Sequence, residues 1–521
     1  MSVKVRITVH NNEIIVYSEN PGNLLELIAQ AGVVFDAPCA GLGRCGKCRV
    51  LVQGDLPTDA VETAVLSEDE IKSGVRLACR KRRVPDGLGI AVPLVAQEHA
   101  PAREGIEPVD AGIAVDLGTT SIVVAFINLT DGTVMSMHSL LNPQRAHGAD
   151  IVSRIRAGLD RTVLDRMTES VIDAVTGEID RMLGEIGLDR KRIKTITIAG
   201  NTVMEHIISG TAVASLAKAP FRPVFTRMRH LPPVSSHLAL ADGSVNLFPL
   251  IGGFVGGDTV ASILACSMDL SDETVALIDI GTNAEIAVGS KTGIIASSAP
   301  AGPAFEGGEI RHGMRAQRGA IDDVRVVDDT VVLSVRGDTE PEGICGSGLV
   351  RIVAELVRAG VITRDGELLD AGRIGGNLAL RSIPQGNEQA FLLYRSSNRE
   401  ICLYQSDIRA FQLAKASIAA GLKMLMEQAG RQPARLFIAG AFGNYLNPED
   451  LGYLGMIPLS LVPNTFFVGD SVIAGQKRFI LNEPAVDMEK LLASIRHLEL
   501  AGDTSFNDRF LSLLALAGDI L

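Results

Sequence analysis

The chain has 521 residues, which corresponds to roughly three domains at about 100–200 residues per domain. Its 49 Lys and Arg residues against 61 Asp and Glu residues give a formal charge of −12, which argues against sequence-independent binding to nucleic acid. Hydrophobic residues make up 46% and charged residues 21%, which excludes a largely disordered chain, and seven cysteines are too few for a disulfide scaffold.

The N-terminus has the pattern of a β-strand, because Val3, Val5, Ile7 and Val9 alternate with polar residues. It lacks the basic start, apolar block and small-residue cleavage site of a secretory signal. No run of 18 or more apolar residues occurs in the sequence. We therefore expect a cytoplasmic location and no membrane segment.

Four of the seven cysteines fall within the first 79 residues. Cys39, Cys45 and Cys48 form a C-x5-C-x2-C run, and Cys79 follows after 30 intervening residues. A [2Fe–2S] cluster needs four thiolates, and the plant-type spacing is C-x4-C-x2-C with a distant fourth cysteine. The four cysteines are therefore predicted to ligate a [2Fe–2S] cluster. A structural zinc is the alternative, but zinc sites usually pair their ligands in two short knuckles.

The elements predicted around these cysteines resemble the β-grasp fold of ferredoxins. A hairpin over about 3–17 precedes an apolar helix over 24–31, and the cysteine loop leads into a strand over 48–53. A capping-box pattern at 67–70 starts a short helix, and a strand over 88–93 closes the unit.

The ferredoxin-like unit is predicted to span residues 1–94. Residues 95–110 carry several charges and two prolines and have no apolar periodicity, so they are predicted to form a flexible linker. A tether of this kind suits an electron carrier that visits more than one docking site.

The rest of the chain is organised around two similar loops of the type D-x-G-T. Each loop follows one apolar strand and precedes another, which predicts a hairpin. Threonine hydroxyls and unhindered glycine N–H groups bind phosphate oxygens, and the aspartate can hold hydrated Mg²⁺. The candidate residues are Asp116, Gly118, Thr119 and Thr120 in the first loop and Asp279, Gly281, Thr282 and Asn283 in the second.

Two more elements recur in the same order after these loops. Residues 195–201 (TITIAGN) parallel residues 436–444 (LFIAGAFGN), and Gly-Asp-Thr-Val at 257–260 matches Gly-Asp-Ser-Val at 469–472. Each of the last two motifs opens a helix of small residues. Three elements repeated in order predict an internal duplication.

The duplication predicts a first lobe over residues 111–270 and a second over 271–521. Between the first and second repeated elements, the second half is longer by about 77 residues. This insertion is expected within about 310–400.

With these repeats, the region resembles the ATPase superfamily of actin, heat-shock chaperones and sugar kinases. The two loops resemble its two phosphate motifs, and Gly440, Gly443 and Asn444 resemble its adenosine motif. The two Gly-Asp-Thr/Ser-Val helices resemble its connecting helices, which pack against each other. The resemblance implies ATP and Mg²⁺ as ligands, with Asp116 and Asp279 as catalytic carboxylates, one of which orients the attacking water.

A predicted helix over 407–415 carries two further candidates. In the chaperone branch, a polar residue and a lysine three positions apart flank the adenosine, and Gln412 and Lys415 have this spacing on one face. The alternative is a surface helix with a solvated lysine.

A [2Fe–2S] ferredoxin fused to such an ATPase resembles the reductive activators of corrinoid-dependent enzymes. The predicted fold class is α+β and α/β, with a β-grasp [2Fe–2S] ferredoxin domain followed by a duplicated actin-like (ribonuclease H-like) ATPase domain. Long members of the family carry an additional domain between these parts, where this chain has only the short linker. The blocks that resemble the family are 142–155, 198–206, 215–225, 299–310, 343–349 and 406–418.

The resemblance implies ATP-dependent transfer of one electron from the cluster to the inactive Co(II) corrinoid of a methyltransferase or corrinoid protein, which restores Co(I). A plant-type [2Fe–2S] centre lies near about −400 mV, so this transfer is uphill. ATP would favour a conformation whose affinity for the corrinoid protein offsets the unfavourable potential. An upstream low-potential electron donor and a possible homodimer are further implications.

Three other functions fit parts of this pattern. The chain could be a plain ferredoxin-type electron carrier for another redox enzyme, or a redox-sensing, chaperone-like ATPase. Activators of radical-type dehydratases are a third alternative, but they hold a cluster between subunits with fewer cysteines each. The remaining cysteines, Cys266, Cys345 and Cys402, are expected to be buried, and Glu306 has no assigned role.

Overall fold

The computed structural model divides into two compact units, residues 1–103 and 104–521. Among the residues that it describes, no helix combines the length and apolar character needed to span a bilayer. The described residues are 3–9, 12–18, 24, 27–28, 33–34, 48–54, 56–66, 68–81, 84–85, 88–91, 97–98, 109–148, 150–231, 243–337, 339–440, 446–500 and 502–520.

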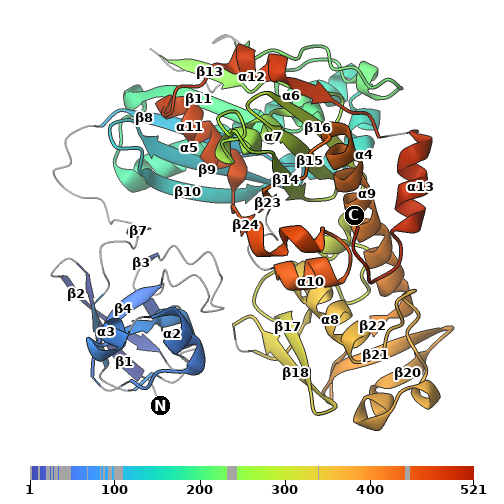
Figure 1. The fold of residues 1–521 in the computed structure, drawn as a ribbon. Helices are drawn as coiled ribbons and strands as arrows, with labels where there is room; N and C mark the ends of the chain where they lie inside the picture. Colours follow the sequence, from blue (N-terminus) through green and yellow to red (C-terminus); the bar gives the residue numbers. More distant parts are fainter. Residues whose placement is uncertain are drawn as a thin grey trace. The chain divides into compact units, whose positions relative to one another are not determined.

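The first unit contains a five-stranded sheet in the order β2-β1-β6-β4-β5 (Figure 1). β1 pairs antiparallel with β2 and parallel with β6, which confirms the predicted hairpin and the β-grasp arrangement. The alternating side chains predicted to face the core, including Val5 and Ile7, are fully buried. The strands are β1 (Val3–Val9), β2 (Asn12–Ser18), β4 (Arg49–Gln53), β5 (Val75–Leu77) and β6 (Leu88–Ala91), with a separate pair β3 (Val33–Val34) and β7 (Gln97–Glu98).

Two short helices, α2 (Ala60–Val65) and α3 (Glu68–Lys72), follow β4. The sequence analysis predicted α3 but not α2, although α2 begins with a capping box in which Asp59 and Glu62 bond each other's backbone N–H groups. Of the predicted helix over 24–31, the structure describes three positions, all helical.

The second unit contains two six-stranded sheets. The sheet of the first lobe has the order β10-β9-β8-β11-β13-β12 (Figure 1). Its strands are β8 (Ala111–Leu117), β9 (Ser121–Asn128), β10 (Val134–Leu141), β11 (Ile193–Gly200), β12 (Arg229–His230) and β13 (Ser244–Leu247). Its helices are α4 (Ile151–Ala157), α5 (Arg161–Ile186), α6 (Thr202–Ile208) and α7 (Gly257–Ala265).

The sheet of the second lobe has the order β24-β23-β14-β15-β16-β25. Its strands are β14 (Val275–Ile280), β15 (Ala284–Ser290), β16 (Gly293–Ala299), β23 (Arg435–Ala439), β24 (Thr465–Phe467) and β25 (Ile495–His497). Its helices are α9 (Gln405–Ala429), α10 (Pro448–Tyr453), α11 (Ser471–Leu481), α12 (Met488–Ser494) and α13 (Thr504–Ser512).

The two sheets repeat one topology. In the first lobe, β8 pairs antiparallel with β9 and parallel with β11; in the second, β14 pairs in the same way with β15 and β23. The registers agree as well, because Asp116 lies opposite Ala199 and Asp279 lies opposite Ala439. The predicted internal duplication and the actin-like fold class are therefore confirmed.

Each sheet is covered by a long helix. The buried side chains of α5 recur every three or four residues, from Leu164 through Met167, Val171 and Val175 to Ile179, and they pack on the first sheet. α9 packs in the same way on β15 and β16. Both central strand groups are buried runs of apolar residues, as expected for strands covered on two faces.

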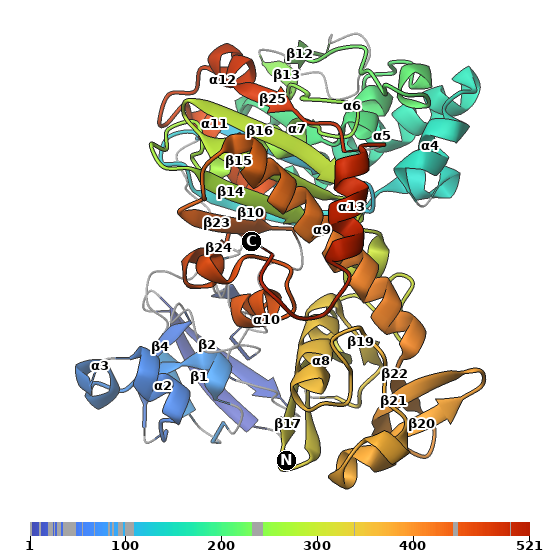
Figure 2. The same cartoon turned by 45° about the vertical axis from the view of Figure 1, so that its right-hand side comes forward.

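In chain order, two small three-stranded sheets and the α-helix α8 come between β16 and α9. Figure 2 shows them at the end of α9 that is away from β16. α8 packs against β17. The first lobe has no counterpart among its described residues, so this segment accounts for the greater length of the second. The elements are β17 (Ala320–Val327), β18 (Thr330–Val335), β19 (Gly343–Ile344), α8 (Gly346–Arg358), β20 (Ser382–Gln385), β21 (Glu388–Arg395) and β22 (Glu400–Tyr404).

Helices α7 and α11 cross closely, as predicted for the repeated Gly-Asp-Thr/Ser-Val helices. The hydroxyls of Ser262 and Ser471 are 2.7 Å apart, and a Cβ at Gly475 would lie 1.8 Å from the carbonyl oxygen of Ala261. Glycine is required at this position because any side chain would strike the other backbone. α7 also contacts β11 and β14, so the crossing ties the two lobes together.

Candidate functional site

The two D-x-G-T turns lie at equivalent ends of the two sheets. Residues 118–120 join β8 to β9, and residues 281–283 join β14 to β15. Asp116 and Asp279 precede the turns, and both are partly exposed. The structure therefore brings the predicted phosphate residues to the same strand ends in both lobes.

Two further carboxylates belong with this pair. Asp258 lies in the first turn of α7, and Asp470 caps α11 by accepting the N–H of Ile473 at 2.9 Å. Burial, followed by the charges of the other three aspartates, raises the pKa of Asp116 well above its usual range. Burial and two of these neighbours raise the pKa of Asp279 to about 7, and burial raises the pKa of Asp258 to about 6.

Asp116 and Asp279, whose pKa values are raised by the neighbouring aspartates, belong to a site that favours a cation. Within the described part of the chain, no three His, Cys, Asp or Glu side chains converge to ligate one ion directly. Mg²⁺ usually keeps several of its waters, so carboxylates that hold it through water fit this arrangement. Asp258 and Asp470 were not predicted as site residues, although an aspartate common to both Gly-Asp-Thr/Ser-Val motifs was a signal for them.

Glycines allow the backbone to approach the turns closely in both lobes. A Cβ at Gly200 would lie 2.6 Å from the carbonyl oxygen of Leu117, and a Cβ at Gly440 would lie 2.5 Å from that of Ile280. Gly440 also has a φ of 94°, which favours glycine. Gly440 thus lies beside the second turn, whereas Gly443 and Asn444 lie outside the described residues.

A buried glutamate, which the sequence analysis did not identify, supports this region of the first lobe. Glu205 on α6 accepts the N–H of Gly200 at 3.2 Å, and its Oε1 leaves no space for a Cβ at Gly257. It therefore joins the end of β11 to the start of α7. Burial raises the pKa of this carboxyl group well above its usual range.

The threonine hydroxyls of the two turns differ in their hydrogen bonds, because one accepts and the other donates. The hydroxyl oxygen of Thr119 accepts from the side-chain amide of Asn201 at 3.0 Å, which leaves its hydrogen for another acceptor. The hydroxyl of Thr282 instead donates to Oε1 of Glu306 at 2.6 Å. Glu306, which had no assigned role, is thus a partner of the second turn.

Gln412 and Lys415 on α9 are buried and bind backbone carbonyls. The amide of Gln412 donates to Leu514 O at 2.7 Å, and the Lys415 ammonium donates to Ala515 O at 2.5 Å and to Gly455 O at 3.3 Å. Burial lowers the pKa of Lys415 to about 8. The alternative of a solvated surface lysine is therefore wrong. In the described part of the structure, these side chains hold the C-terminal segment against α9.

Two of the four predicted cluster ligands lie in described segments of the first unit. Cys48 is fully buried just before β4, and its carbonyl accepts the N–H of Ala78 at 2.9 Å, which places the backbone of Cys79 beside it. The backbone thus brings two of the four predicted ligands together, which fits a [2Fe–2S] cluster held by four thiolates. Cys39 and Cys45 lie outside the described residues. The predicted burial of the other three cysteines, Cys266, Cys345 and Cys402, is confirmed.

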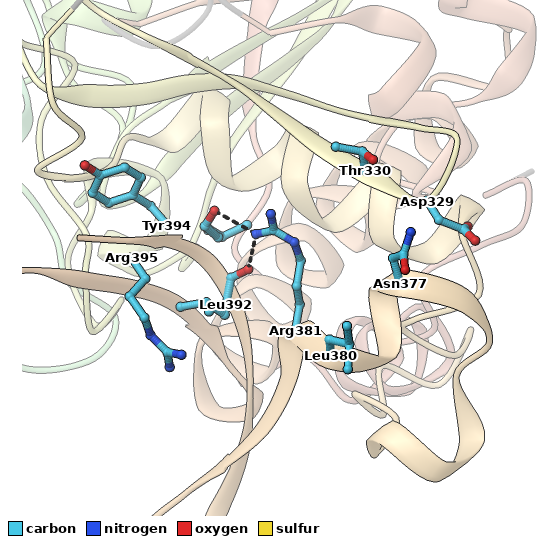
Figure 3. A pocket seen from close by; sticks show the side chains of 9 residues that line it. Asp329, Thr330, Asn377, Leu380, Arg381, Leu392, Tyr394 and Arg395 are labelled. Atoms are coloured by element: carbon cyan, nitrogen blue, oxygen red, sulfur yellow. Dashed lines mark hydrogen bonds between the residues drawn. The ribbon is translucent and has the colours of Figure 1, made fainter. Parts of the chain in front are cut away.

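An open hollow of about 480 Å³ lies in the insertion, away from these groups (Figure 3). It lies between β18, β21 and the segment over 377–381, where Arg381 donates to the carbonyls of Leu392 and Leu393 at 2.9 and 3.1 Å. None of the sequence-predicted site residues lines it.

Family models match almost the entire chain. Residues 7–82 match the 2Fe-2S iron-sulfur cluster binding domain, residues 111–271 match the RACo middle region, and residues 273–520 match the C-terminal domain of RACo, the ASKHA domain. The middle-region model covers the segment interpreted above as the first lobe.

Characterised relatives and one solved structure resemble the chain over most of its length. It is 32% identical to the corrinoid activation enzyme RamQ of Eubacterium limosum over 80% of this chain and 71% of that one. It is 25% identical to the [Co(II) methylated amine-specific corrinoid protein] reductase of Methanosarcina barkeri over 78% and 76% of the two chains. A structure of a reductive activator for corrinoid, iron–sulfur protein superposes with a TM-score of 0.69, at 25% identity and over 98% of both chains.

The superposition covers 98% of that activator, whereas 29% of RamQ lies outside the match with this chain. The cysteine spacing, the duplicated phosphate turns and relatives matched over more than two thirds of their length all lead to one assignment. The chain belongs to the RACo family, the reductive activators of corrinoid proteins.

Proposed function

We propose that this protein uses ATP to drive transfer of one electron from a [2Fe–2S] cluster in its first unit to the Co(II) corrinoid of a partner protein, which restores Co(I). The observation that carries the proposal is that one chain holds both the ferredoxin cysteines and duplicated phosphate turns at which neighbouring aspartates raise the pKa of Asp116 and of Asp279. The relatives named for corrinoid activation and Co(II) corrinoid reduction support it.

The residues have distinct roles in this proposal. A bound cluster supplies a single electron at low potential, and Cys39, Cys45, Cys48 and Cys79 hold it. The two turns bind the phosphates of ATP, and Gly440, Gly443 and Asn444 line the adenosine side. The four aspartates hold hydrated Mg²⁺, and either Asp116 or Asp279 orients the attacking water. Gln412 and Lys415 act by holding the C-terminal segment near the nucleotide.

In this proposal ATP acts by biasing the complex between the two proteins and does not react with the cobalt. Nucleotide held between the two lobes favours one arrangement of α7 and α11, and that arrangement binds the corrinoid protein more tightly. A difference of 59 mV costs tenfold in the one-electron equilibrium, so a tenfold preference for the product complex offsets it. A low-potential electron donor, a cytoplasmic location and a homodimer complete the proposal.

The decisive experiment follows Co(I) absorbance after the reduced protein is mixed with a Co(II) corrinoid protein, with and without Mg-ATP. Co(I) should appear only with ATP. Appearance at the same rate without ATP would instead identify a plain electron carrier. ATP hydrolysis without any Co(I) would identify a redox-sensing ATPase.

The cluster assignment has a separate test. Replacing Cys79 with Ala should abolish the visible [2Fe–2S] spectrum, whereas Cys266→Ala, a matched change of a buried cysteine on α7's C-terminal end, should leave it unchanged. An intact spectrum in the Cys79→Ala protein would refute the ligand set.

A further inference from the structure

Residues of the block 142–155 pack against the first phosphate turn and bond to its carbonyl groups. The block contains a 3-10 helix, Pro143–His147, and most of α4. Three successive carbonyls of the turn accept hydrogen bonds from this block. Gly118 O accepts from the Asn142 side-chain amide at 2.8 Å, Thr119 O from the Arg154 guanidinium at 2.5 Å, and Thr120 O from the Asn142 N–H at 3.0 Å.

This pattern fixes the direction of the turn's N–H groups. In a planar trans peptide, the C=O of one residue and the N–H of the next point in opposite directions. Because Gly118 and Thr119 direct their carbonyls into the block, the N–H groups of Thr119 and Thr120 point away from it. Two outward N–H groups beside the hydroxyl of Thr119 are suited to a phosphate group.

Arg154 is a fully buried cation, with no exposed surface. Its other partners are the Gly148 carbonyl at 3.0 Å, the Gln144 side-chain oxygen at 3.4 Å and the Met204 sulfur at 3.1 Å. Among the described residues, no carboxylate lies within ion-pair distance of it, and the nearby charges that act on it are those of Asp150 and Arg145. Burial lowers the pKa of Arg154 to about 10, so the guanidinium keeps its charge at neutral pH.

The second phosphate turn has a different support. There, Glu306 accepts the hydroxyl of Thr282, and Gly281 N–H bonds to Asn283 O within the turn itself. The duplicated turns are therefore electrostatically unequal, with a buried cation behind the first and a carboxylate beside the second. A buried charge is weakly screened, so this difference acts on whatever the first turn binds.

We propose that Arg154 is a positioning residue for the phosphates of the nucleotide: it holds the first turn with its N–H groups outward and supplies the positive charge behind it. This inference rests on the proposed ATP site and extends it to a residue that touches neither ATP nor Mg²⁺. Asn142 shares the positioning role as a neutral donor. The unpaired charge of Arg154 is then balanced when a phosphate binds.

The test compares binding of Mg-ATP and of adenosine to the full-length, cluster-loaded protein by calorimetry. Arg154→Gln keeps a hydrogen-bond donor and removes the charge, Arg154→Lys keeps the charge, and Arg156→Gln changes an exposed arginine of the same helix. We expect Arg154→Gln to lose about 10–100-fold in ATP affinity, the range for hydrogen bonds to charged groups, and to bind adenosine as before. Arg154→Lys should bind ATP more tightly than Arg154→Gln, and Arg156→Gln should match the parent protein.

Steady-state kinetics give an independent readout. KM for ATP should rise in Arg154→Gln more than kcat falls, because the turn binds phosphate before the chemistry. Asn142→Asp provides a second test that can replace Arg154→Gln if that variant does not fold. It keeps the acceptor for the Gln144 N–H and loses the donor to Gly118, so it should show the same selective loss of ATP affinity.

Equal ATP affinity in Arg154→Gln and the parent protein would overturn the inference, as would an equal loss for ATP and adenosine. A parent protein that binds no ATP would instead refute the proposed function, before any variant is compared. The two failures are therefore distinguishable.

Discussion

At the residue scale, a buried ion pair holds the segment that carries Cys79. The Lys81 ammonium bonds to the Glu62 carboxylate and to Pro57 O at 2.6 Å, and Glu62 also accepts the N–H groups of Leu77 at 2.9 Å and Asp59 at 3.1 Å. Both charged side chains are almost completely buried. Glu62 on α2 therefore bonds to Leu77 and to Lys81, which lie before and after Cys79 in the sequence.

Replacing Glu62 with Gln should destabilise the first unit by about 3–5 kcal/mol, because Lys81 would remain buried and uncompensated. Urea unfolding followed by the loss of cluster absorbance measures this change. The matched control is Glu70→Gln, which removes a partly exposed pair with Arg49 and should cost no more than about 1 kcal/mol. Similar costs for the two variants would contradict the role given to the buried pair.

A second residue, His206, makes the stability of the second unit depend on pH. Its Nδ1 donates to Thr202 O at 2.8 Å and its Nε2 accepts the Val224 N–H at 2.9 Å, so the network requires the neutral ring. Burial, only partly offset by the Thr202 bond, lowers its pKa to about 4. The unfolded chain binds the proton more readily, so the stability from this site is complete above pH 6.5 and is lost as the pH falls toward 4.

We expect His206→Gln to remove part of this pH dependence. The shift from 6.5 to about 4 corresponds to about 3 kcal/mol of acid destabilisation at pH 4. Denaturant unfolding at pH 7.5, 6 and 5 measures the free energy of unfolding of both proteins. The difference in this free energy between the parent protein and the variant should narrow as the pH falls. A constant difference across this range would show that His206 does not titrate on unfolding.

At the element scale, the contact between α7 and α11 depends on one glycine. Gly475→Ala should cost about 1–3 kcal/mol, because its Cβ would strike the carbonyl of Ala261 and push the helices apart. Gly184→Ala, in the exposed part of α5 with open space around it, should instead gain about 0.5–1 kcal/mol. Thermal unfolding of both variants, with ATP hydrolysis measured beside it, tests whether the crossing also supports the site.

Elements with local signals were predictable from the sequence. The strands beside Asp116 and Asp279 were recognisable because apolar runs end in a D-x-G-T turn, and the repeated motifs gave the duplicated topology. The buried partners were not predictable, because Arg154 binds Thr119 and Glu205 lies against Gly257, and only the fold brings these distant residues together. α2 was missed although Asp59 and Glu62 form a capping box, since its six residues have little periodicity. The role of Glu306 also needed the structure, because this residue lies 24 positions after Thr282.

At the scale of the whole molecule, the chain joins two independently compact units, with the boundary at residue 103. The cluster lies in one unit and the nucleotide site in the other. Part of the predicted linker over 95–110 is strand β7, which pairs with β3 and so belongs to the first unit. If the rest of the linker is flexible, we expect it to give the ferredoxin unit a high effective concentration at the ATPase unit, in the millimolar range for short flexible linkers. Electron delivery should therefore depend on this covalent connection, whereas ATP hydrolysis should not.

Cleavage of the linker in the folded, cluster-loaded protein tests this dependence. A protease site placed within residues 99–108 would allow the same preparation to be assayed before and after cutting. Because the effective concentration is lost on cleavage, Co(I) formation at micromolar protein should fall at least tenfold and should rise again as the concentration of both fragments increases. The cluster spectrum and the ATP hydrolysis rate serve as internal controls and should not change. Unaltered Co(I) formation after complete cleavage would mean that the two units hold each other through their surfaces, and the linker would then have no role in electron delivery.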